Sequence, residues 1–128
     1  MILTLERPSL ALLPSFRAAL VEEQAEGNYL DLTPEALPAH IAALLARSHD
    51  PLPGRVPETV FWGVVGGEYV GRVSLRHFLD PQLEQWGGHI GYQVRPSRRG
   101  QGYGHALLGG VLPHARALGL ERVRLHCD

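Results

Sequence analysis

The sequence predicts a single α+β domain over residues 1–128, with the element order β-α-α-β-β-β-α-β. Three observations lead to this fold class. Apolar side chains recur at helical spacing in three separate segments. Two strand-like runs are joined by the turn signal Gly66-Gly67-Glu68, and the chain closes with a strand, a glycine-rich turn, a helix and a strand. Because neither half of the 128 residues is long enough for a good core, we expect one domain.

The first strand and the first helix lie before residue 28. A short apolar run over 2–5 predicts the strand. Ser9 is placed to cap a helix over 10–25, which ends at Gly27. Pro14 lies inside this helical pattern, so the helix either starts or bends there.

The rest of the chain is predicted from turn residues and apolar runs. Thr33 followed by Pro34 predicts a second helix that runs to about Arg47. The proline-rich stretch 48–57 and the stretch 78–88 predict loops within the domain. The remaining elements are strands at 59–65, 69–75, 89–95 and 122–127 and a helix at 103–118 that ends before Gly119.

The composition excludes several classes of protein. The chain has no Lys, so it offers no lysine amine for a Schiff base, and its single cysteine, Cys127, excludes an internal disulfide framework and a cysteine-rich zinc site. The 7 histidines show no metal-ligand spacing, so we expect no metal. We expect a cytoplasmic protein without membrane or nucleic-acid partners. The chain has no long apolar stretch, no basic signal sequence and a formal net charge of −1.

Positive charge and glycine are concentrated in the second half. Residues 1–60 hold 4 Arg and 8 acidic residues, whereas residues 61–128 hold 8 Arg and 5 acidic residues. The second half also holds 13 of the 15 Gly. This distribution favours close contact between the second half and an anion.

The turn before the last helix has the features of a phosphate-binding site. Gly100, Gly102 and Gly104 alternate at a helix start, where the first N–H groups lack partners and the dipole is positive. The cations that precede this turn are Arg95, Arg98 and Arg99. The glycines alone are also explained by a left-handed turn with close helix packing. A Walker motif is excluded because no lysine follows the glycines, and the turn comes too late in the chain for a dinucleotide fold.

The segment Arg99-Gly100-Gln101-Gly102-Tyr103-Gly104 resembles the acetyl-coenzyme A motif Gln/Arg-x-x-Gly-x-Gly/Ala of the GNAT superfamily of N-acetyltransferases. The stretches 71–77 and 87–92 are similar to a bacterial group of predicted acetyltransferases. The resemblance covers nearly the whole chain and implies a GNAT-like mixed sheet. It also implies acetyl transfer from acetyl-coenzyme A to a primary amine of a small molecule or peptide.

Carried over by position, the resemblance implies a cofactor motif over 93–105. The N–H groups of Gly100 to Gly104 would bind the pyrophosphate, and Gly91 would mark a bulge that opens the strand for the cofactor arm. The implied cofactor-binding residues are Gln93, Val94, Arg95, Arg98, Arg99, Gly100, Gln101, Gly102, Tyr103, Gly104 and His105.

Direct acyl transfer needs a donor for the developing oxyanion and a group that deprotonates the amine. We expect the Val94 N–H to be the donor and His89 to be the base, because an imidazole titrates near neutral pH. Glu84 and His77 are second choices. His89 is explained equally well as a hydrogen-bonded strand residue. Cys127 alternates with apolar positions in its strand and is interpreted as a packed thiol.

Members of the family continue beyond the counterpart of Asp128 through a helix and two strands, so the resemblance implies a C-terminally truncated member. Val123 and Leu125 would then lie on an open strand edge, which predicts a homodimer through this edge. Two functions remain open: an active N-acetyltransferase, and a non-catalytic coenzyme A-binding or dimerisation module.

Overall fold

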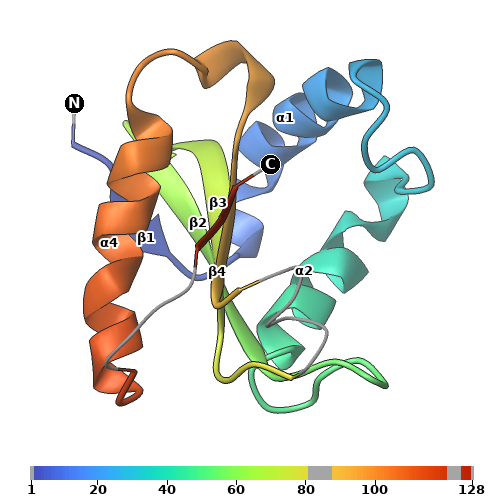
Figure 1. Cartoon of the computed structure of the whole chain (residues 1–128). Coiled ribbons are helices and arrows are strands. Elements are labelled where there is room, and N and C mark those ends of the chain that lie inside the picture. Colours follow the sequence, from blue (N-terminus) through green and yellow to red (C-terminus); the bar gives the residue numbers. More distant parts are fainter. Residues whose placement is uncertain (1, 81–87, 121–124, 128) are drawn as a thin grey trace.

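The computed structural model describes residues 2–80, 88–120 and 125–127. Its five strands form one sheet in the order β1-β2-β3-β4-β5 (Figure 1). Neighbours from β1 to β4 pair antiparallel, and β5 pairs parallel to β4. The strands are β1 (Thr4–Glu6), β2 (Glu58–Val65), β3 (Glu68–Arg76), β4 (Ile90–Val94) and β5 (Leu125–Cys127). The α+β fold class predicted from the sequence is confirmed.

Helices cover both faces of the sheet. The helices α1 (Leu13–Ala25) and α2 (Leu37–Ala46) lie on one face, and α4 (Tyr103–Ala117) lies on the other (Figure 1). Short 3-10 turns are formed by η1 (Leu10–Leu12), η2 (Pro34–Ala36) and η3 (Pro96–Arg98). The turn η3 carries the chain from β4 toward α4, so it lies directly before the glycine-rich segment.

Side chains along β2 point alternately to the two faces of the sheet, so the core has two layers. Trp62 is fully buried with α1 and α2, where its ring stacks on Phe16 at a centroid distance of 4.6 Å. Phe61 points to the other face and joins Leu107 and Val111 of α4. Successive strand residues face opposite sides of a sheet, so one strand supplies both cores.

The first helix begins at Leu13, with residues 10–12 in a tighter turn. Pro14 stands in its first turn, where the missing N–H costs no hydrogen bond, so the helix starts at the proline instead of bending there. Ser9 precedes the tight turn but makes no capping hydrogen bond through its side chain.

The sheet has a register shift, but it does not lie at Gly91, where a bulge was predicted. Gly91 pairs in regular register with Ser74 on one side and with β5 on the other. The register shift falls between Gly63 and Val64, in the pairing of β2 with β3. The expected bulge at Gly91 is therefore wrong. Within the described residues, the pairing of β4 with β5 extends as far as Tyr92.

None of the described helices is both long and apolar enough to cross a membrane.

Candidate functional site

The last residue of β4 directs its backbone polar groups toward an open edge. Gly71 of β3 lies opposite Val94, and the Arg95 N–H donates to the Val70 carbonyl at 2.8 Å. In an antiparallel ladder this bond marks Gly71 and Val94 as a non-hydrogen-bonded pair. The N–H and C=O of Val94 therefore point away from β3. Within the described residues β5 pairs with β4 only as far as Tyr92, so this edge is open at Val94.

The turn between β4 and α4 leaves a helix start without a side-chain cap. Gly102 occupies the N-cap position with a left-handed φ of 83°. The Ala106 N–H donates to the Gly102 carbonyl at 3.2 Å. The N–H groups of residues 103–105 precede this bond, so they have no acceptor inside the helix. Together with the positive end of the helix dipole they form a site suited to an anion.

Two of the three glycines in this turn border open space. Gly100 and Gly102 have φ values of 78° and 83°, and an added Cβ would meet no heavy atom within 4 Å at either position. Gly104 differs, because its added Cβ would lie 2.9 Å from the ring of Tyr92. Gly104 therefore allows α4 to pack closely on β4, whereas Gly100 and Gly102 keep space free beside the helix start.

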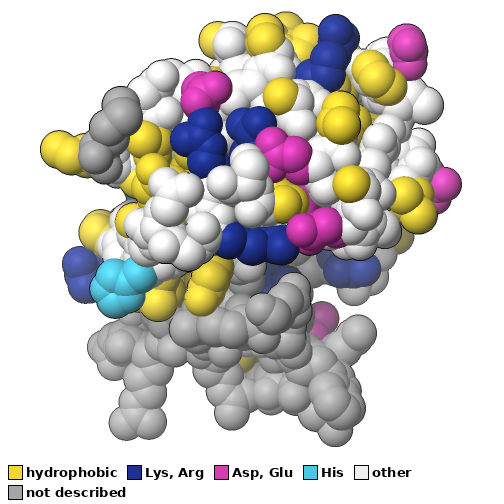
Figure 2. All heavy atoms as spheres, turned by 90° about the horizontal axis from the view of Figure 1, so that it is seen from above, with side chains coloured by type: hydrophobic (Ala, Val, Ile, Leu, Met, Phe, Trp, Pro, Cys, Tyr) yellow, Lys and Arg dark blue, Asp and Glu magenta, His cyan; other side chains and the backbone are white. Residues whose placement is uncertain are grey.

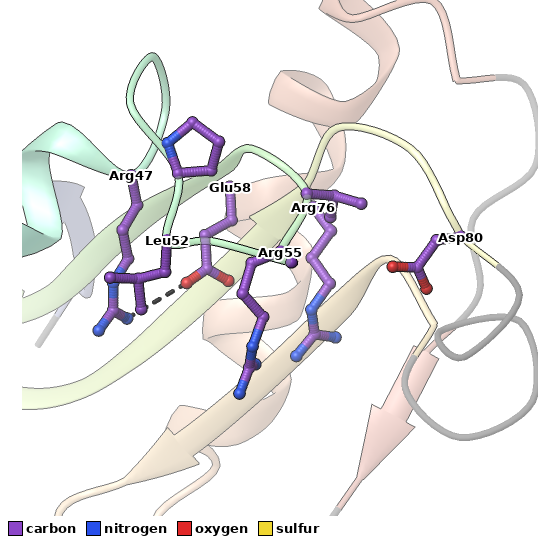
Figure 3. Close-up of a pocket in the computed structure, with 9 residues that line it drawn as sticks. Arg47, Leu52, Arg55, Glu58, Arg76 and Asp80 are labelled. Carbon is purple, nitrogen blue, oxygen red and sulfur yellow. Dashed lines mark hydrogen bonds and ion pairs between the residues drawn. The ribbon is translucent and has the colours of Figure 1, made fainter.

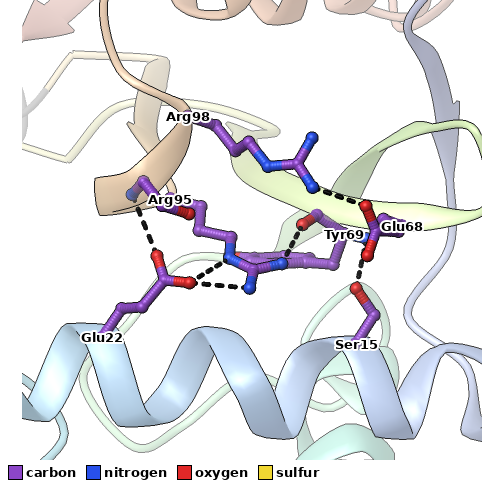
Figure 4. A network of polar contacts seen from close by, with 7 residues as sticks. Ser15, Glu22, Glu68, Tyr69, Arg95 and Arg98 are labelled. Carbon is purple, nitrogen blue, oxygen red and sulfur yellow. Dashed lines mark hydrogen bonds and ion pairs between the residues drawn. The ribbon is translucent and has the colours of Figure 1, made fainter.

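The Arg95 side chain extends between α1 and β3, toward Glu22 and Tyr69 (Figure 4). Its side chain is 9% exposed and pairs with Glu22 of α1 at 2.7 Å. It also donates to the Tyr69 carbonyl at 3.2 Å. The other oxygen of Glu22 accepts the Ser97 N–H at 2.9 Å, which fixes η3 to α1. The Arg95 side chain therefore joins the end of β4 to α1 and to β3.

Arg98 and Arg99 lie near the turn but are each paired with a glutamate. Arg98 bonds to Glu68, and Arg99 makes two bonds of 2.9 Å to Glu26. Figure 2 looks onto this end of the molecule and shows arginine and acidic side chains side by side. These arginines would meet a phosphate only by leaving or sharing their glutamates. Among the remaining predicted residues, Gln101 and His105 are exposed, and Tyr103 is half-buried.

A cavity of about 650 Å³ lies beside the open edge of β4. Its lining comes from β4, from the loop after α1 and from the turn before α4, namely Asn28, Tyr29, Tyr92, Gln93, Val94 and Arg99. A ligand in this cavity would lie against the end of β4. The sequence prediction included Gln93, Val94 and Arg99 but neither residue of the loop after α1.

The loop after α1 is held in a strained conformation over this cavity. Tyr29 has a φ of 54°, which is uncommon for a residue with a side chain. The Gln24 side chain donates to the carbonyls of Tyr29 and Leu32 at 2.9 and 2.8 Å, and the Tyr29 hydroxyl accepts from Arg72 at 3.2 Å. Strain of this kind persists where several contacts hold it and is frequent at functional sites. The Asn28-Tyr29 pair after Gly27 is the sequence signal for this loop.

Glu23 is a buried carboxylate next to the cavity that sequence reasoning missed. It is 6% exposed, and one oxygen accepts a hydrogen bond of 2.6 Å from Gln93. The other oxygen has no hydrogen-bond partner in the described part of the chain. Burial raises the pKa of Glu23, despite the opposing charge of Arg99. Glu23 therefore positions the Gln93 side chain, and nothing in the local sequence distinguishes it from its neighbour Glu22.

The comparison with protein families decides the class of the protein. Residues 20–128 match the sequence model of the acetyltransferase (GNAT) family. The chain belongs to this family. A search of curated proteins found no match.

Solved structures share the fold of this GNAT chain. One is RimL, a ribosomal L7/L12 alpha-N-protein acetyltransferase, with a TM-score of 0.68 and 17% identity over 99% of this chain and 67% of that chain. A second, from Salmonella typhimurium and described as modifying the N-terminal serine of L7/L12, has a TM-score of 0.66 and 20% identity over 99% of this chain and 70% of that chain. A RimL structure in complex with coenzyme A has a TM-score of 0.64 and 16% identity over 89% of this chain and 63% of that chain. At these identities the likeness shows the fold.

The two predicted catalytic groups of the GNAT chain lie at opposite ends of β4. His89 immediately precedes β4, is 9% exposed, and its carbonyl accepts the Arg76 N–H. The five residue steps from His89 to Val94 span about 16 Å of extended strand. An imidazole at that distance does not reach a group held at the Val94 N–H. His77 bonds to Thr59 at 2.8 Å at the same end of the sheet as His89.

Two further predicted residues are not placed by the structure. Glu84 lies outside the described residues. Cys127 lies in β5 and pairs with Tyr92 of β4, and its side chain lies outside what the structure describes. Within the described residues, no group of three His, Cys, Asp or Glu side chains is arranged to hold a metal ion.

Proposed function

We propose that this GNAT chain is an acetyl-coenzyme A-dependent N-acetyltransferase that acts on a primary amine. The observation that carries the proposal is the open backbone edge at Val94 beside the uncapped start of α4. Membership of the acetyltransferase family supports the class of reaction. The backbone at Val94 supports a position for the thioester, and the start of α4 supports a position for the pyrophosphate.

The residues at the turn fit a pyrophosphate. An anion can approach the N–H groups of residues 103–105 because no side chain occupies the space beside Gly100 and Gly102. Arg99 lines the cavity on the same side and adds a guanidinium once it shares or leaves Glu26. Coenzyme A, when bound, supplies the activated thioester.

The backbone at the end of β4 binds the acyl group of the thioester. The Val94 N–H, which points away from β3, is placed to donate to the thioester carbonyl oxygen and to stabilise negative charge there. An extended cofactor arm adds to this edge as a peptide adds to an exposed strand. The Gln93 side chain lies on the face of the sheet that α1 covers, where its amide donates to Glu23. Gln93 also lines the cavity, and we place the acceptor on this side of it.

The first acceptor to test is the N-terminal amine of a peptide. Two of the structures with the same fold are described as acting on the ribosomal protein L7/L12. A peptide α-amine has a pKa of about 8, so a substantial fraction is neutral near that pH. A lysine amine has a pKa above about 10 and is almost fully protonated there.

Calorimetric titration with acetyl-coenzyme A tests the cofactor site. We expect Gly102→Ala to weaken binding at least tenfold (about 1.4 kcal/mol), because its Cβ would stand in the space for the pyrophosphate. The matched control is Gly119→Ala, at a position with φ of 82° and equally open space but at the far end of α4. Both variants carry similar backbone strain. Equal affinities for the two variants would refute the assignment of the cradle.

Thiol release measured over a panel of amines tests the reaction itself. Turnover with a peptide amine supports the enzyme. Binding of acetyl-coenzyme A without turnover of any amine would instead support a non-catalytic coenzyme A-binding module.

The predicted homodimer remains a proposal that concerns the last strand. In the described sheet β5 lies at one end of the strand order, so one of its edges is available for pairing with a second copy. Light scattering at two protein concentrations would give twice the monomer mass if the proposal holds. A monomer mass of 14.1 kDa at both concentrations would contradict it.

A further inference from the structure

A groove lined by arginines continues along β4 from the proposed acyl-transfer site. Two adjoining cavities of about 180 and 270 Å³ share three arginines and Glu58 in their lining. The smaller cavity also shares Tyr92 and Gln93 with the cavity at Val94. We call the two adjoining cavities the arginine groove, after Arg47, Arg55, Arg72 and Arg76.

The charges in the arginine groove are not balanced by its own acidic residues. Among the described residues that line the groove, Glu58 and Asp80 are the acidic ones, against four guanidinium groups. Glu58 is paired with Arg47 at 3.2 Å. In Figure 3 the side chains of Arg47, Arg55 and Arg76 extend in the same direction, and Asp80 stands at one end. The excess of positive charge in a concave site raises the local concentration of anions.

Arg55 is the member of the groove that is available to a ligand. No described residue makes a hydrogen bond or an ion pair with its side chain, which is exposed. A guanidinium presents several donors in a planar fork that matches a carboxylate. Arg72 is held in the groove by the Tyr29 hydroxyl, so the groove and the cavity at Val94 share a wall.

The floor of the groove contains a buried hydroxyl without a partner. Ser74 is 3% exposed, and its Oγ has no hydrogen-bond partner in the described part of the chain. Gly91 lies opposite Ser74 in the sheet, and an added Cβ there would approach no closer than 3.8 Å to Arg76. Most buried hydroxyls in proteins are hydrogen-bonded. The unpaired Ser74 hydroxyl can donate a hydrogen bond to an anion, and the surrounding arginines supply positive charge. The groove is therefore suited to an anionic group.

We infer that the acceptor amine of this enzyme carries a carboxylate that binds in the arginine groove. The inference rests on the proposed function and names its class of acceptor. The phosphates of the coenzyme are assigned to the turn before α4, beyond the opposite end of β4, so the groove is left to the acceptor. The three residue steps from Gly91 to Val94 span about 10 Å of strand. The carboxylate and the amine of the acceptor therefore lie about 10 Å apart.

Two kinds of molecule meet this spacing. One is an extended peptide with an acidic side chain at its second or third residue, and the other is an ω-amino acid of the same length. Matched probes separate them: the tripeptides Ser-Ala-Asp and Ser-Ala-Asn with amidated C-termini, and ω-aminooctanoate with its amide. We expect at least one acidic probe to exceed its neutral partner about tenfold in kcat/KM. Equal values within both pairs would overturn the inference.

The variant Arg55→Glu links the preference to the groove. We expect it to abolish the preference for the acidic probe and to leave acetyl-coenzyme A affinity unchanged, since Arg55 lies away from the turn before α4. The matched control is Arg116→Glu, an exposed arginine on α4 on the other face of the sheet. A preference that survives Arg55→Glu, or falls equally in the control, would overturn the inference.

Direct binding separates this inference from the proposed function. Titration of the acidic and neutral tripeptides into the protein without coenzyme A measures the groove alone. Tighter binding of the acidic peptide that is lost in Arg55→Glu supports the groove even if no amine is acetylated. Acetylation of both peptides at equal rates, with equal affinities, supports the enzyme and rejects the groove.

Discussion

Replacing Glu22 by Gln tests whether α1 holds the turn that leads into the glycine-rich segment. One oxygen of the Glu22 carboxylate accepts from Arg95 Nε at 2.8 Å and Nη2 at 2.7 Å, and the other accepts from the Ser97 N–H at 2.9 Å (Figure 4). Burial raises the pKa of Glu22, but the hydrogen bonds from Arg95 and Ser97 outweigh burial and lower it from 4.5 to about 2. The charged form is therefore the one that the fold stabilises.

The size of the effect follows from this pKa. One pKa unit corresponds to about 1.4 kcal/mol, so the charge of Glu22 adds at most about 3.5 kcal/mol to the free energy of unfolding at neutral pH. The Glu22 side chain is 25% exposed, so solvent screens part of this energy. We expect Glu22→Gln to cost about 2 kcal/mol near pH 7.

The sign of the pH dependence is fixed by the direction of the pKa change. Because the folded-state pKa lies below the unfolded-state value, the contribution is complete above about pH 5 and is lost as the pH falls toward about 2. Urea unfolding of both proteins at about pH 7, 5 and 3 measures it. We expect the difference between them to shrink at the lowest pH. A loss that is the same at every pH would refute the electrostatic explanation and indicate a packing defect.

Three further predictions concern neighbouring parts of the site. Because burial raises the pKa of Glu23, its charge costs stability once the pH is high enough to ionise it, and Glu23→Gln should raise the free energy of unfolding at neutral pH in the same urea assay. Gly71→Ala should cost about 2 kcal/mol more than Gly67→Ala in thermal unfolding, because its Cβ would lie 2.7 Å from a backbone oxygen of β4 and the Cβ of Gly67 meets nothing. Glu26→Gln should tighten acetyl-coenzyme A binding a few-fold in calorimetry, because it releases Arg99, and unchanged affinity would show that Arg99 does not meet the phosphates.

The order of the elements followed from local features of the sequence. The hairpin around Gly66-Gly67 and the helix end at Gly119 were predicted correctly, because turn residues and apolar spacing act over a few positions. Pro14 marked the start of the first helix for the same reason. The bulge was misplaced to Gly91, because register depends on which strands pair and not on the glycine alone.

The candidate site was predicted in part. The turn around Gly102 was found from the sequence, since a helix start after glycines is a local feature. The Glu23 carboxylate and the strained Tyr29 were missed, because their roles arise from contacts with β3 and β4. His89 was predicted to be the base and the Val94 N–H the oxyanion donor, and the strand β4 separates them.

The sequence by itself determined that this protein has a strand, a glycine turn and a helix with a free N-terminus, since backbone conformation there depends on neighbours in the chain. Only the tertiary structure decided which partner each arginine side chain has. Arg95 and Arg99 each pair with a glutamate 73 positions away, and the arginine groove gathers residues of three segments. The energy of a charge depends on distance and burial in space, so residues equivalent in the sequence become a structural ion pair, an anion contact or a substrate site.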